Sequence, residues 1–435
     1  MEDVESKGID IKEESSQSLS PDLNVTPSIP SAQQDGRQAW TVVCGAFCAT
    51  LCTFGSTTGF GVFQAYYESD LLKTHSASQI GWIAGIQYCL LFLLGLPTGL
   101  LHDRGYTRYM IVIGSVIAVI AQLCVGWCTQ YWQFILVQGI IFATGTGLVF
   151  NPVCASVPAW FDNRRNMALG VMAMGSGLGG SVYSIMAASL LDKVGFPWTC
   201  RALALLMLCL LTLVRPFPRR PPPPTPSTME ILVKKQSWVQ RNLPYIILNI
   251  GTFLASAGVY LPVNYANAYV DRLGLTDPSL KYLVAIINGT SLIGRLSAGH
   301  IADLIGPIIV MAAGVAACGI MCFFWTKCLT PAAIIVFAVV YGIVQGAYVA
   351  LLPAGAAHIR SRKLGRSIGI TFSICSISIL VSPSIFGAII SDDPGAKAYN
   401  SPAIYSGCVC CAACVLFILT EIAYKRELRI LAENG

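Results

Sequence analysis

Long apolar runs separated by short polar connections repeat along nearly the whole chain. Each run is close to the ~20 residues that an α-helix needs to cross ~30 Å of hydrocarbon. The pattern predicts twelve spans, at 40–67, 80–101, 109–128, 131–154, 167–190, 197–214, 243–267, 280–302, 306–326, 331–353, 366–390 and 402–424. The sequence therefore predicts an all-α polytopic membrane protein with twelve transmembrane helices.

The composition agrees with a chain that lies mostly in lipid. Hydrophobic residues make up 54% of it, charged residues 11%, and the mean hydropathy is +0.64, so polar groups are too few to cover a water-soluble surface. The net charge of +6 could indicate a nucleic-acid partner, but the lysines and arginines form short clusters between apolar runs rather than one basic face. We expect the lipid bilayer as a partner and no nucleic acid.

One long connection divides the spans into two sets of six. Residues 215–242 contain four consecutive prolines and are expected to form a linker between helical bundles at 40–214 and 243–424. Residues 1–39 carry eight acidic residues and no apolar core of the kind found in signal peptides, so we expect a disordered tail. Residues 425–435 form a second tail.

The distribution of basic residues predicts the orientation. With the N-terminus inside, cytosolic segments hold 20 of the 28 Lys and Arg residues, outer segments hold seven, and Arg295 lies within the membrane. Basic residues concentrate in cytosolic loops. Both termini and the linker are therefore expected in the cytosol, with the plasma membrane as the expected location.

A weak internal repeat supports the division into halves. Residues 99–108 read Gly-Leu-Leu-His-Asp-Arg-Gly-Tyr-Thr-Arg, and residues 299–306, displaced by 200 positions, read Gly-His-Ile-Ala-Asp-Leu-Ile-Gly. Such repeats indicate two parallel, pseudo-symmetric six-helix bundles. Glycine permits close helix approach, and an acidic group is stabilised at a helix N-terminus. We therefore predict a gating latch built from Asp103, Arg104, Arg108 and Asp303.

These motifs and the six-plus-six plan resemble the major facilitator superfamily over residues 40–424. Residues 160–180, with a bulky pair, a basic turn and a glycine-rich fifth helix, are similar to the monocarboxylate-porter family, particularly its fungal branch. Residues 59–64 and the Gly294-Arg295 pair fit that family too. The resemblance implies a secondary carrier that works by alternating access, without cofactor or metal, and we expect it to function as a monomer.

Arg295 is the central candidate for substrate binding. Asn288, Ser291 and Arg295 are spaced by three and four residues, which places them on one helical face. An arginine in the middle of a span costs ~2.5–3.5 kcal/mol on insertion scales, so it should face a cavity and a partner. In the resembled family the matching arginine is implicated in binding the substrate carboxylate, which predicts a small organic anion. The alternative is a structural arginine bonded to backbone carbonyls or reaching the cytosolic interface.

The resemblance also has gaps. The first span lacks the lysine of proton-linked members, and Ser291 replaces an acidic residue one turn before Arg295, so proton coupling stays open. By the family's order of cavity-lining helices, Gln64, Tyr260 and Asn264 are the further candidates for the cavity wall, although each could instead bond another helix.

The predicted function is therefore transport of a carboxylated metabolite, with export of a fungal secondary product weighed against uptake. A nutrient sensor or receptor on a carrier scaffold is the alternative class. A membrane enzyme is disfavoured because no cluster of His, Asp, Glu and Cys converges at one depth, and no catalytic residue is assigned.

Overall fold

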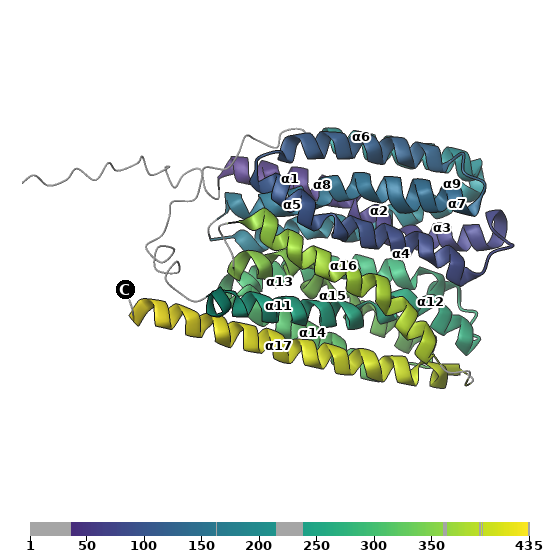
Figure 1. Ribbon diagram of the computed structural model, residues 1–435. Helices are drawn as coiled ribbons and strands as arrows, with labels where there is room; N and C mark the ends of the chain where they lie inside the picture. The colour runs from purple at the N-terminus through teal and green to yellow at the C-terminus, as the bar shows by residue number, and fades with distance from the viewer. Residues whose placement is uncertain are drawn as a thin grey trace, which may run out of the picture.

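The computed structural model describes residues 36–161, 163–214, 238–359, 363–390, 393 and 395–433. These residues form a bundle of long helices that run roughly side by side, and no strand occurs among them (Figure 1). The described chain begins and finishes at the same end of the bundle, on the left of Figure 1. We call this the terminal end, and the other the opposite end.

The N-terminal half extends to residue 214. Its elements are α1 (Arg37–Cys52), α2 (Phe54–Thr58), α3 (Phe60–Tyr66), η1 (Tyr67–Leu71), α4 (Ala77–Leu93), α5 (Gly95–Asp103), α6 (Thr107–Val125), α7 (Tyr131–Phe134), η2 (Ile135–Phe142), α8 (Ala143–Ser156), η3 (Val157–Trp160) and α9 (Arg165–Thr212). The 48-residue α9 is two spans, because the chain reverses at Gly195, whose φ of 77° is non-helical and suits a residue without a Cβ.

The C-terminal half begins, in the described part of the chain, at Trp238. Its elements are α11 (Trp238–Val259), α12 (Leu261–Leu273), η4 (Pro278–Tyr282), α13 (Leu283–Ile305), α14 (Pro307–Trp325), α15 (Pro331–Ile359), α16 (Leu364–Ile389), η5 (Gly395–Tyr399) and α17 (Asn400–Glu433). The break between α11 and α12 precedes Pro262, whose ring fits a helix start and not a helix interior.

The observed helices confirm the predicted fold class. Among the described residues, ten helical segments are long and apolar enough to cross a membrane, and one of these is the two-span α9. The helix α13 adds a further segment of 23 residues and carries the polar face with Asn288, Ser291 and Arg295. Together these segments account for the twelve predicted spans.

Two helix pairs join the halves most extensively. They are α9 with α13 and α5 with α16, and α4 also packs on α16. We call the first two the α9–α13 interface and the α5–α16 interface. Most of the predicted tail (1–39) and most of the predicted linker (215–242) lie outside the described residues, so these assignments stay predictions.

Candidate functional site

The Arg295 side chain crosses the α9–α13 interface. It is 3% exposed, and its Nη1 donates to the Ala173 carbonyl oxygen at 2.6 Å and to the Ser176 hydroxyl oxygen at 2.5 Å. Ser176 in turn donates to the Ala173 carbonyl at 2.8 Å. The guanidinium therefore bonds to the other half of the molecule, as the structural alternative for this arginine anticipates.

These bonds leave the charge of Arg295 uncompensated. The two salt bridges recorded between described residues are Lys73–Asp70 and Lys425–Glu421, and no Asp or Glu is among the buried side chains that the structure describes. The Nε atom of Arg295 is buried and has no hydrogen-bond partner. A guanidinium has five N–H donors in a fixed fork, so this site retains donors for an anion.

The two polar neighbours of Arg295 on α13 differ in their bonding. Ser291 donates to the Asn288 carbonyl oxygen at 2.6 Å, within its own helix. The Asn288 amide is 7% exposed and has no hydrogen-bond partner among the described residues. The amide packs against Gly180 of α9. A Cβ atom added to that glycine would lie 3.3 Å from Asn288 Nδ2. Asn288 is thus available to a ligand at this interface.

Tyr260 is the further candidate that interacts electrostatically with Arg295. Its phenol is within electrostatic range of the Arg295 guanidinium and of Tyr88 on α4, so groups from both halves approach one another here. The other two candidates have no such interaction with Arg295 among those the structure describes. Gln64 donates to Glu68 Oε1 at 3.0 Å within its own helical segment, and Asn264 is exposed on α12.

Asp103 bridges the halves at the terminal end. Its carboxylate accepts from the backbone N–H groups of Gly365 at 3.0 Å and Arg366 at 2.9 Å. These N–H groups begin α16 and have no partner within the helix. The carboxylate therefore caps a helix of the other half and is stabilised by the positive end of its dipole.

Asp303 forms the reciprocal contact. Its carboxylate accepts from the backbone N–H groups of Asn166 at 2.9 Å and Met167 at 3.0 Å, which begin α9 in the N-terminal half. The Asn166 amide also donates to the Ala302 carbonyl at 3.2 Å. The two aspartates of the sequence repeat thus cap one helix in each half.

Glycines set the close approach of helices at both caps. On the α5–α16 interface, a Cβ on Gly99 would collide with the Gly365 carbonyl and a Cβ on Gly369 with the Gly95 carbonyl. On the α9–α13 interface, a Cβ on Gly170 would come within 2.6 Å of the Arg295 carbonyl oxygen. Side chains larger than hydrogen would hold the halves apart here.

A serine forms a second tie on the α5–α16 interface that sequence analysis did not identify. Pro97 has no N–H, so the Leu93 carbonyl oxygen four residues earlier lacks its helical donor. The Ser373 hydroxyl of α16 donates to this carbonyl at 2.9 Å and accepts from the Leu96 N–H at 3.1 Å. The proline was the available signal, because it predicts an unpaired carbonyl at this depth.

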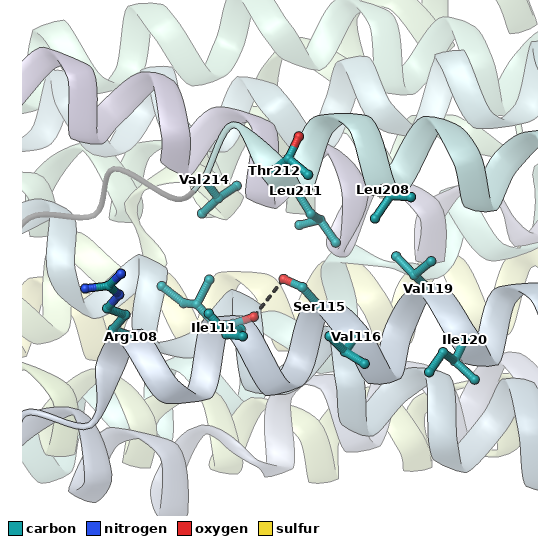
Figure 2. A pocket seen from close by; sticks show the side chains of 11 residues that line it. Arg108, Ile111, Ser115, Val116, Val119, Ile120, Leu208, Leu211, Thr212 and Val214 are labelled. Atoms are coloured by element: carbon teal, nitrogen blue, oxygen red, sulfur yellow. Dashed lines mark hydrogen bonds between the residues drawn. The ribbon is translucent and has the colours of Figure 1, made fainter.

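The two arginines of the predicted latch are exposed and do not donate the N–H groups that bind the two aspartates. Arg104 is exposed at the end of α5. Arg108 is exposed in the first turn of α6, and no ion pair or hydrogen bond joins its side chain to another described residue. Figure 2 shows Arg108 at one end of a pocket between α6 and α9.

Aromatic side chains from both halves meet beside the Ser373 tie. Phe372 of α16 stacks on Phe150 of α8 at 5.5 Å between ring centroids, and contacts Phe92 of α4 edge-on at 5.3 Å. Phe54 of α2 contacts Phe92 at 5.4 Å. Sequence analysis missed this cluster, because apolar residues in apolar spans give no signal of which rings meet.

Comparisons with known proteins identify the family. The model of the Major Facilitator Superfamily matches residues 46–383 and 250–429. An MFS-type transporter of Ophiocordyceps sp. is 37% identical over 92% of this chain and 89% of its own length. The Agnestins efflux protein of Paecilomyces divaricatus is 32% identical, covering 93% of this chain and 92% of its own.

A third relative and one solved structure are also similar to this chain. The Aspyridones efflux protein of Emericella nidulans is 32% identical, over 85% of this chain and 76% of its own length. The proton:xylose symporter XylE superposes with a TM-score of 0.67 over 87% of this chain and 94% of its own, at 13% identity, a likeness of fold alone. The chain therefore belongs to the major facilitator superfamily, and it is a multi-pass membrane transporter with the twelve-helix fold of that family and not the fold of an enzyme.

Proposed function

We propose that this transporter exports a carboxylated secondary metabolite by alternating access, in the manner of the monocarboxylate porters. The observation that carries the proposal is Arg295, a buried cation between the halves that lacks an anionic partner among the described residues. An uncompensated charge at this depth is costly. A substrate carboxylate would neutralise it, and a guanidinium binds carboxylates through two parallel hydrogen bonds.

Substrate binding would also change how the halves are joined. A carboxylate that takes the guanidinium fork competes with the Ala173 carbonyl and the Ser176 hydroxyl for the same donors. Binding would therefore weaken the tie between α13 and α9 at the position where the anion sits. We assign Asn288 and Tyr260 to the same binding site, since Asn288 has a free amide and Tyr260 lies within electrostatic range of Arg295.

Asp103 and Asp303 serve as the gate at the terminal end in this proposal. Their caps join the halves there, so the state described is closed at that end. Opening requires both carboxylates to leave the helix N-termini. We assign Gln64, which bonds Glu68, and the exposed Asn264 to the route toward the opposite end.

Three further features of the proposal concern direction, location and coupling. Relatives named as efflux proteins support export, and the distribution of basic residues supports a cytosolic terminal end. We place the protein in the plasma membrane, where an exporter would release its substrate from the cell. The described spans hold no buried carboxylate. Proton coupling, where it occurs, would therefore use the proton of the substrate rather than a carboxylate relay in those spans.

Flux in sealed vesicles tests the function. Inside-out vesicles are prepared from yeast that express the chain. Aromatic and aliphatic carboxylic acids, each paired with its primary amide, are added to the outer medium, and their uptake into the vesicles is measured. We expect accumulation of at least one acid above vesicles from cells without the chain, and little of its amide. Saturable binding without flux would favour a receptor, and accumulation of amides equal to acids would contradict the anion assignment.

A further inference from the structure

A groove on the outer surface of the N-terminal half is separate from the site at Arg295. It lies between α6 and the second span of α9 and has a volume of about 590 Å³ (Figure 2). Aliphatic side chains of both helices line it, among them Ile111, Val116 and Ile120 of α6 and Leu208 and Leu211 of α9. The groove runs along the helices within the membrane-spanning region, so its surroundings are hydrocarbon.

The polar atoms inside the groove are already satisfied. The Ser115 hydroxyl donates to the Ile111 carbonyl at 2.7 Å, shown by the dashed line in Figure 2, and the Thr212 hydroxyl donates to the Cys209 carbonyl at 2.6 Å. Both bonds remain within one helix. The groove therefore offers no free donor for a polar metabolite along its length and suits a hydrocarbon chain.

Charge is present at one end of the groove. Arg108, in the first turn of α6, is its one charged lining residue and lies near Val214 at the terminal end (Figure 2). Its guanidinium is exposed and unpaired with any other residue that the structure describes. The neighbouring Tyr106 and Tyr109 are 51% and 66% exposed, as expected of aromatic residues at a membrane–water interface. Arg108 therefore lies at the depth of the lipid headgroups, at one end of the apolar groove.

We propose that this groove binds an anionic phospholipid from the leaflet on the terminal side. One acyl chain lies between α6 and α9, and the headgroup phosphate pairs with Arg108. Arginine matches the geometry of a phosphate, and a basic residue at the surface prefers lipids of net negative charge over zwitterionic ones. The site uses residues of one half only, so it can stay occupied while the halves move.

Native mass spectrometry of the full-length protein tests this site. The protein is titrated with phosphatidylglycerol or phosphatidylcholine, and bound lipids are counted for wild type, Arg108→Gln, Val116→Phe and Arg426→Gln. Arg426 is an exposed arginine of α17 without a described partner, so it is a matched loss of charge away from the groove. Melting temperatures within the wild-type range show that each variant is folded.

Wild type should retain phosphatidylglycerol over phosphatidylcholine. Arg108→Gln should reduce phosphatidylglycerol retention about five-fold, the effect of one basic residue near the lipid surface, and leave phosphatidylcholine unchanged. Val116→Phe, which fills the groove, should lower retention of both lipids, and Arg426→Gln neither. Equal retention of both lipids by wild type, equal effects of the two arginine variants, or unchanged retention in Val116→Phe would overturn the proposal.

Discussion

The α5–α16 and α9–α13 interfaces repeat one design with different chemistry. In each, an aspartate at the end of one helix caps the N-terminus of a helix in the other half: Asp103 on α16 and Asp303 on α9. In each, a second tie lies about two helical turns deeper. At the α5–α16 interface it is the neutral Ser373, and at the α9–α13 interface it is the cation Arg295.

This difference separates two tasks. The Ser373 hydroxyl is paired with the Leu93 carbonyl and the Leu96 N–H of the second span, so this hydroxyl has no donor to offer a ligand. Arg295 keeps a buried N–H without a partner. We therefore propose that the α9–α13 interface recognises the ligand, and that both interfaces hold the closed state.

The largest expected effect is at Arg295. Arg295→Gln should lower carboxylate transport at low substrate concentration by the equivalent of ~2–5 kcal/mol, as for loss of a desolvated ion pair. Arg295→Lys keeps the charge without the planar fork and should retain part of the transport. Initial rates in vesicles, at matched expression, measure this. Equal rates for wild type and the Gln variant would make Arg295 a structural residue.

Gly365→Ala should separate the helices at the α5–α16 interface. Its Cβ would meet the Gly99 carbonyl and the Asp103 carboxylate, and overpacking of this kind costs ~1–3 kcal/mol. Hydrogen–deuterium exchange should rise in α5 and in the first turns of α16. Gly289→Ala on α13 is the control, because its nearest neighbour would be Ser181 Oγ at 4.0 Å. Similar exchange in both variants would show that close approach is dispensable.

Asp103→Asn and Asp303→Asn should slow turnover by similar factors. Each removes a negative charge from a helix N-terminus, an effect of ~0.3–1 kcal/mol at an exposed site. Because both residues lie at the terminal end, substrate affinity at equilibrium should stay within a few-fold of wild type. Parallel measurement of flux and binding checks this. A matching loss of affinity in either variant would place that aspartate in the substrate site.

Ser373→Ala should have an effect on conformational balance of a size similar to that of the aspartate variants. It leaves the Leu93 carbonyl without its donor, a loss of ~1 kcal/mol for one hydrogen bond, and should shift the balance of open and closed states without changing affinity for the carboxylate. Ser297→Ala is a suitable control, since that hydroxyl donates to Ile293 within its own helix. A change in carboxylate preference in Ser373→Ala would contradict the proposal that ligand recognition belongs to the α9–α13 interface.

Much of this arrangement was predictable from the sequence. The lengths of the apolar runs predicted the spans, and the repeat predicted that Asp103 and Asp303 are equivalent, because both signals reside in side chains. Arg295 stood out as a lone charge in an apolar run. Its partner did not, since the Ala173 carbonyl is a backbone group and carries no sequence signal.

Other parts depended on packing and were less accessible. Gln64 and Asn264 were selected by the resembled family's helix order, which carries no information on side-chain bonding or exposure. The Gln64 amide bonds Glu68 within its own segment, and Asn264 is exposed. Ser373 had a signal only in combination with Pro97 on a distant helix. Properties of a single helix could thus be predicted from the sequence, whereas contacts between segments far apart in the chain could not.

The central claim is that Arg295 recognises the charge of the substrate. Its most direct test is equilibrium binding of a transported acid and of its primary amide to purified wild type and Arg295→Gln. We predict that wild type prefers the acid by a factor corresponding to ~2–5 kcal/mol, and that the Gln variant binds acid and amide with similar affinity. A Gln variant that retains the full wild-type preference for the acid would contradict the account.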